Sequence, residues 1–119
     1  MNLAGSIDMR ENIADYEAEC GDAVVTNLLG GPPTAVPDRY VQVSASTVLP
    51  LGVAQILIWG EQDNFVPRAL AEQYVRAASQ AGDRAELLGV PGVGHVETAS
   101  PASSAWPHVR GAIRSLLTN

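Results

Sequence analysis

The chain has 119 residues, of which 46% are hydrophobic, and seven Lys and Arg against 13 Asp and Glu give it a formal net charge of −6. This length allows one domain at most, and the hydrophobic content is enough to fill a core, which excludes a disordered polymer. An acidic chain without a cluster of Lys and Arg is a poor binder of nucleic acids and of anionic membranes, so we expect neither as a partner.

The N-terminal residues carry no targeting signal. Residues 1–7 lack a positively charged segment and are followed at once by Asp8, and no apolar run approaches the roughly 20 residues that a membrane span needs. The single cysteine, Cys20, has no partner within the chain for a disulfide, which favours a reducing compartment. We therefore expect a cytoplasmic protein.

The first elements are an extended segment and a helix. Residues 2–7 are typical of the end of an extended strand. Asp8 resembles a helix N-cap, and Glu11 three residues later would complete a capping box. Apolar residues then follow at helical spacing as far as Gly21, which would end the helix.

Two shorter helices are predicted next. Asp22 would cap a helix that runs through Leu29 and is ended by the Gly-Gly-Pro-Pro turn at 30–33. A further turn of helix is predicted over 37–43, and 44–53 has the composition of a loop.

The second half alternates between strands and helices. Residues 54–59 are apolar without alternation, as expected of a central parallel strand that is buried on both faces. Pro67 is well placed to begin a helix that Gly82 ends, and 85–90 is the next strand. After a loop over 91–101, a last helix is predicted over 102–117.

Each of these helices has one apolar face. We expect the helix that begins at Pro67 to direct Leu70, Tyr74, Ala77, Ala78 and Ala81 inward. We expect the helix over 102–117 to direct Trp106, Val109, Ile113, Leu116 and Leu117 inward.

This order predicts an α/β fold with parallel strands. Function in such sheets gathers at the carboxyl ends of the strands. Asp63 and His95 both lie just beyond a predicted strand end, on loops that contain glycine. A carboxylate and a histidine that converge there supply two of the three groups of a Ser-His-Asp triad.

The loop sequences resemble a known family. Gly60-Glu61-Gln62-Asp63-Asn64-Phe65-Val66-Pro67 and, on the next loop, Gly94-His95 are similar to the C-terminal part of α/β-hydrolase fold serine hydrolases of the prolyl-oligopeptidase-like and dienelactone-hydrolase-like branch of esterases and peptidases. The resemblance covers 37–117 well and 3–36 loosely. It implies a partial α/β-hydrolase domain over 1–119, with two or three strands of the parallel sheet.

The resemblance also implies a chemistry. Asp63 would be the triad acid and His95 the general base in acyl transfer on a small ester or peptide substrate, and no cofactor is implied. The nucleophile of this family lies on a Gly-x-Ser-x-Gly turn further upstream, and no serine of this chain has that context. Met1 falls near the family's strand after the nucleophile, so we expect a truncated hydrolase that is inactive alone.

Other interpretations stay open. The chain could be a non-catalytic module that self-associates or binds a partner through the sheet edge left at 2–7. Asp63 alone would more often be a turn or N-cap residue, and His95 a loop histidine. Glu61 could replace Asp63 as the acid, and the set Asp63, His95, Glu97 and His108 matches no known metal-ligand spacing. Trp59 and Trp106 are expected in the core.

Overall fold

A computed structural model of the chain describes residues 1–11 and 13–118. The strands are β1 (Asn2–Leu3), β2 (Gln55–Gly60) and β3 (Ala85–Val90); the α-helices are α1 (Ile13–Cys20), α2 (Val24–Leu29), α3 (Pro37–Val43), α4 (Arg68–Gln80) and α5 (Trp106–Leu117); and the short 3₁₀ helices are η1 (Ala45–Thr47) and η2 (Val96–Ala99). The strands form a parallel sheet in the order β1-β2-β3, which confirms the predicted α/β class.

The central strand β2 is buried on both faces. Leu57 and Trp59 pack into the core that includes α4, whereas Ile56 and Ile58 pack into the core that includes α5. Successive side chains of a strand point to opposite faces, so each helix covers one face of the sheet. The absence of alternation in the sequence correctly indicated this position.

The strand–helix–strand unit has almost the predicted boundaries. Strand β3 spans 85–90 as expected, and Pro67 is the N-cap of α4. Helix α5 begins at Trp106 rather than at 102, because 100–105 form turns in which Ser103 N donates to Ser100 O. Its start places Pro107 in the first turn, where a missing N–H costs no hydrogen bond.

The inward faces of the two helices differ in part from the prediction. In α4 the buried residues are Ala71, Tyr74 and Ala78, whereas Ala81 is exposed. In α5, Leu117 lies in the last turn and is 80% exposed. Of the other residues expected to point inward, Leu70, Ala77, Trp106 and Leu116 are half-buried, Val109 is buried and Ile113 is 38% exposed.

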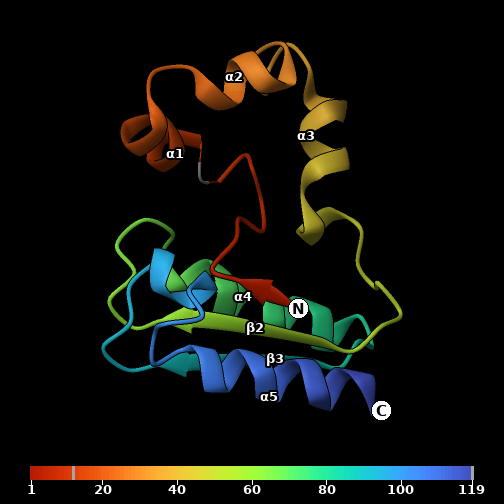
Figure 1. The fold of residues 1–119 in the computed structure, drawn as a ribbon. Helices are drawn as coiled ribbons and strands as arrows, with labels where there is room; N and C mark the ends of the chain where they lie inside the picture. Colours follow the sequence, from red (N-terminus) through yellow and green to blue (C-terminus); the bar gives the residue numbers. More distant parts are fainter. Residues whose placement is uncertain (12, 119) are drawn as a thin grey trace.

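Residues 9–11 and 13–43, which we call the helical insert, stand apart from the sheet. Helices α1, α2 and α3 arch above it, whereas α4 and α5 lie along it (Figure 1). Helix α3 has the predicted bounds. The insert has a small core of its own, formed by Val25, Leu29 and Tyr40.

Both predicted acidic caps are wrong. Asp8 does not cap α1, which begins at Ile13; its Oδ1 instead accepts a hydrogen bond from Arg10 N (2.9 Å), in a turn before the helix. Asp22 does not cap α2, whose N-cap is Ala23 in a left-handed conformation (φ 59°) without a side-chain hydrogen bond. A short polar side chain satisfies a turn as readily as a helix end, so the sequence pattern could not separate the two.

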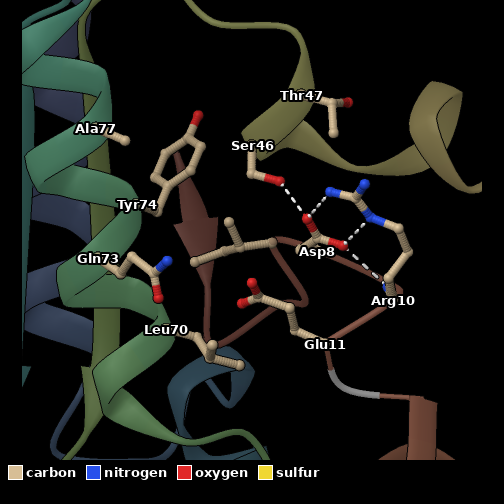
Figure 2. A pocket seen from close by; sticks show the side chains of 10 residues that line it. Asp8, Arg10, Glu11, Ser46, Thr47, Leu70, Gln73, Tyr74 and Ala77 are labelled. Carbon is tan, nitrogen blue, oxygen red and sulfur yellow. Dashed lines mark hydrogen bonds and ion pairs between the residues drawn. The ribbon is translucent and has the colours of Figure 1, made fainter.

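Asp8 instead joins the two ends of the helical insert. Its carboxylate is bound by the Arg10 guanidinium (2.5 Å) and by Ser46 Oγ (2.7 Å), as Figure 2 shows, and Met9 N donates to Ser44 Oγ (3.1 Å). The segments at the start and at the end of the helical insert therefore meet in one polar cluster. The hydrogen bonds from Arg10 hold the pKa of the Asp8 carboxyl well below its usual value.

Candidate active site

Backbone hydrogen bonds join the loop that follows β2 to the end of β3 and to the loop after it. Glu61 N donates to Val90 O (3.0 Å) and Gln62 N to Val93 O (2.9 Å). At Gly60, where β2 ends, a side-chain carbon would overlap the carbonyl oxygen of Val93. Glycine is therefore required for the two strand-end loops to approach this closely.

The predicted contact between the acid and the histidine is confirmed. His95 Nδ1 and Asp63 Oδ2 are 2.9 Å apart. The Asp63 side chain is fully buried, and that of His95 is 34% exposed. A carboxylate only accepts hydrogen bonds, so the neutral imidazole that fits this contact carries its proton on Nδ1 and leaves Nε2 as an acceptor.

The second oxygen of Asp63 holds the local turn. Oδ1 accepts hydrogen bonds from Phe65 N (2.8 Å) and Val66 N (3.1 Å). Asp63 is therefore both a turn residue, through Oδ1, and the hydrogen-bond partner of His95, through Oδ2. The turn fixes the carboxylate, so Oδ2 is presented to the imidazole in one direction.

His95 is held at its backbone and on one ring face. Thr98 Oγ1 donates to His95 O (2.7 Å). The Phe65 ring stacks on the imidazole, with centroids 4.7 Å apart and planes inclined by 29°. Tyr16 of α1 then meets Phe65 edge-on, at 5.2 Å and 76°. Burial raises the pKa of the Tyr16 phenol.

Phe65 and Tyr16 were not among the residues predicted for the site. Phe65 lies between Asp63 and Pro67 in the strand-end motif, and its position two residues after the acid was a usable signal. Tyr16 gave no such signal, because nothing local in the sequence indicates that α1 reaches this loop.

The alternative residues do not join the pair. Glu61 is exposed and forms an ion pair with Arg68 (3.6 Å). Glu97 lies exposed in η2, and His108 lines an open groove along α5 with Glu86 and Ser115. Within 1–11 and 13–118, no three or more His, Cys, Asp or Glu side chains are grouped so that they could hold a metal ion.

No serine hydroxyl among the described residues forms a hydrogen bond with His95. Ser6, which follows β1 at the same edge of the sheet, lies next to Tyr16. Among the described residues, the side chains brought together at this point are therefore Asp63, His95 and the groups that contact them.

A separate cavity of about 230 Å³ lies between the ends of the helical insert and α4. In Figure 2, Asp8 and Arg10 face Tyr74 and Gln73 across it, with Glu11 between them. Neither Asp63 nor His95 lines this cavity. Its volume is below the usual range of a ligand pocket.

No helix in the described parts of the chain has the length and hydropathy to cross a membrane. The sequence matches no protein-family model and none of the curated proteins. Similar solved structures do exist.

Several of the similar structures are of an esterase, Est2, from the planctomycete Thermogutta terrifontis. The propionate-bound structure is 24% identical over 95% of this chain, with a TM-score of 0.60. The butyrate-bound structure is 21% identical over 72% of it, with a TM-score of 0.60, and the structure phosphonylated by cyclosarin is 23% identical over 66%, with a TM-score of 0.57. The chain spans 39%, 32% and 31% of those esterase chains, respectively. It therefore has the fold of part of an α/β-hydrolase type esterase.

Proposed function

We propose that this chain carries the acid and the base of a serine hydrolase that cleaves carboxylic esters by acyl transfer. The observation that carries the proposal is the 2.9 Å contact between Asp63 Oδ2 and His95 Nδ1 at the carboxyl ends of β2 and β3. Asp63 is the orienting acid and His95 the general base. We propose an ester rather than a peptide substrate because several similar structures of this fold are of an esterase.

The proton transfers follow from the tautomer. With the proton on Nδ1 donated to Asp63, Nε2 of His95 accepts the proton of a serine hydroxyl as its oxygen attacks the ester carbonyl. The imidazolium that forms is stabilised by the buried carboxylate. The imidazolium then gives the Nε2 proton to the departing alcohol. A water molecule next attacks the acyl group and gives a proton to Nε2, and this proton returns to the serine oxygen as the carboxylic acid product is released.

The nucleophile must come from outside these 119 residues. None of their serines lies in a Gly-x-Ser-x-Gly turn, and this turn also supplies one of the oxyanion-hole donors in hydrolases of this fold. We therefore propose that another segment provides both, and that the 119-residue chain alone hydrolyses no ester. General-base assistance is worth roughly 100- to 10,000-fold, but only to a nucleophile that is present.

The test begins with the reading frame upstream of the Met1 codon. If it encodes Gly-x-Ser-x-Gly, the extended protein is expressed and assayed with short-chain nitrophenyl esters and with a fluorophosphonate probe. His95→Ala and Asp63→Asn should each abolish most of the activity, with a loss of about 10⁴-fold expected for the acid by analogy with serine proteases. His108→Ala, the other histidine, is the matched control and should keep full activity.

Two results would contradict the proposal. One is full esterase activity in the extended protein with Asp63→Asn. The other is stoichiometric fluorophosphonate labelling of a serine within the 119-residue chain, which would mean that the nucleophile is already present.

A second candidate function, a partner-binding module, is favoured by the outer edge of β1. This strand pairs only with β2 among the described strands. Ala4 N donates to Ile58 O (2.9 Å), and backbone groups alternate in direction along a strand, so the N–H and C=O of Leu3 point to the opposite edge. We propose that these groups pair with a strand of another segment or of a second copy of the chain.

Two variants at one position test this pairing. Leu3→Pro removes the outward N–H without touching the hydrogen bonds to β2, whereas Leu3→Ala keeps the N–H and removes only the side chain. If strand addition drives association, light scattering should show that Leu3→Pro lowers the apparent mass and Leu3→Ala does not. A monomeric wild-type chain would remove the self-association form of the proposal.

A further inference from the structure

We infer that Phe65 is a positioning residue for His95 and that Tyr16 of α1 fixes Phe65 in that role. The inference rests on the proposed function in calling His95 a base, but its geometric claim stands without it. Phe65 contacts both members of the pair. Its backbone N–H donates to Asp63 Oδ1 (2.8 Å), and its ring covers one face of the His95 imidazole at 4.7 Å.

These contacts restrict different motions of the histidine. The hydrogen bond from Thr98 Oγ1 fixes the backbone carbonyl of His95, and the contact with Asp63 fixes one ring edge. A single hydrogen bond at Nδ1 still allows the ring to rock about that bond. The inclination of only 29° between the planes of Phe65 and His95 means that such rocking drives the imidazole into the phenyl ring.

Phe65 itself is held from the helical insert. Both Phe65 and Tyr16 are partly buried and pack against the core formed by residues such as Trp59 and Val66. Tyr16 meets Phe65 edge-on at 76°, which is one of the two preferred arrangements of aromatic pairs. The insert thus supports the imidazole through a row of three rings, Tyr16, Phe65 and His95.

The orientation of the stack determines which edge of His95 is available. The phenyl ring covers a face and not an edge, so it leaves Nε2 open for a proton from a nucleophile. No hydrogen bond to Nε2 is formed by residues 1–11 or 13–118. Phe65 thereby limits the direction of Nε2 without occupying the place where a serine hydroxyl would approach.

Nuclear magnetic resonance of the histidine rings tests the inference without any catalytic assay. The chain has two histidines, and exposed His108 serves as an internal reference. In the 119-residue chain the His95 ring C–H order parameter should be close to that of rigid backbone, about 0.85, and its ring protons should be shifted upfield by Phe65. Phe65→Leu should remove the upfield shift and lower the order parameter to below about 0.6.

Further variants separate positioning from folding. Tyr16→Leu should lower the order parameter of the His95 ring by less than Phe65→Leu does, and it supplies the test if Phe65→Leu fails to fold. Tyr74→Phe removes the hydrogen bond from Tyr74 to Gln55 (2.6 Å) and should leave the His95 ring unchanged. Backbone order at 93–97 should stay constant in all three variants, because positioning concerns the ring alone.

The nucleophile-bearing protein adds a kinetic measurement. There Phe65→Leu should lower kcat about two- to tenfold, the range expected from losing one aromatic contact, with KM unchanged. A His95 ring whose order parameter stays the same in Phe65→Leu would overturn the inference, as would equal loosening in Tyr74→Phe. Absence of esterase activity with a rigid, stacked His95 would instead overturn only the proposed function.

Discussion

The sheet with α4 and α5 and the helical insert are built in different ways. Strand β2 buries side chains on both faces, and two clusters of apolar residues cover it. The insert has one small cluster around Tyr40. It is joined to the sheet by the polar cluster at Asp8 and by the contact between Tyr16 and Phe65.

This difference shows how the candidate site is supported from two sides. The sheet determines where Asp63 and His95 lie, because backbone hydrogen bonds join the carboxyl ends of β2 and β3. The insert contributes to the position of the His95 ring, because Tyr16 contacts Phe65 and Phe65 stacks on one face of the imidazole. Substitutions in the sheet core should therefore abolish the contact between Asp63 and His95. Substitutions in the insert should leave this contact in place but make the His95 ring more mobile.

The largest effect is expected from the sheet. Trp59 is fully buried in the core shared with α4, so Trp59→Ala should lower the free energy of unfolding by about 3–5 kcal/mol. Because this side chain lies one residue before Gly60, the contact between Asp63 and His95 should be lost with it. Urea unfolding followed by circular dichroism measures the change. A loss below about 1 kcal/mol would show that the sheet core is not the main source of stability.

A smaller, local effect is expected from the insert. Tyr40 is fully buried against Val25 and Leu29, and its hydroxyl donates to Gly31 O (3.1 Å). Tyr40→Ala should raise amide hydrogen exchange in α1, α2 and α3 while β2 and β3 keep their protection, since separate cores open separately. Equal loss of protection in both regions would show that they unfold as one unit.

The polar cluster should respond to pH. Because Arg10 lowers the pKa of Asp8 in the folded chain, Asp8 contributes stability above about pH 4, its unfolded value, and this contribution is lost as the pH falls below that value. Asp8→Asn should cost about 1–3 kcal/mol at pH 7, and the difference from the wild type should shrink below about pH 4.

The matched control is Asp22→Asn, an exposed aspartate that caps no helix. Asp22→Asn should not lower the free energy of unfolding at pH 7, and its difference from the wild type should not shrink below about pH 4. A difference between wild type and Asp8→Asn that stays constant from pH 7 to pH 3 would contradict the assigned role of the ion pair.

The smallest effect is expected at the end of α5. Leu117 is 80% exposed, so Leu117→Ser should change the free energy of unfolding by less than about 0.5 kcal/mol. Thermal melts of the two proteins measure it. A loss of 1 kcal/mol or more would show that another chain covers this residue in solution.

The sequence predicted the sheet better than the insert, for a physical reason. The bounds of β3 and the two-sided burial of β2 follow from local composition, because the central strand of a parallel sheet must be apolar throughout. Asp8 and Asp22 were wrongly assigned as caps, because short polar side chains bind turns and helix ends by the same hydrogen bonds.

The sequence predicted one part of the candidate site, the pair of Asp63 and His95, but not the aromatic residues that support it. Asp63 and His95 could be paired from their strand-end positions, since parallel strands bring their carboxyl ends to one edge. Tyr16 could not be placed beside them, because its contact with Phe65 depends on how the insert folds back over the sheet. Its contact is a tertiary one, and the periodicity of α1 contains no information about it.

Whether Asp63 orients His95 is tested by the tautomer of the His95 ring, which is read from the nitrogen chemical shifts of the ring at a pH where both histidines are neutral. If Asp63 orients the base, His95 should be held with its proton on Nδ1, while exposed His108 exchanges between both tautomers. Asp63→Asn should move the proton of His95 towards Nε2, since an amide can donate to Nδ1. A wild-type His95 that averages between tautomers as His108 does would show that Asp63 does not orient the ring.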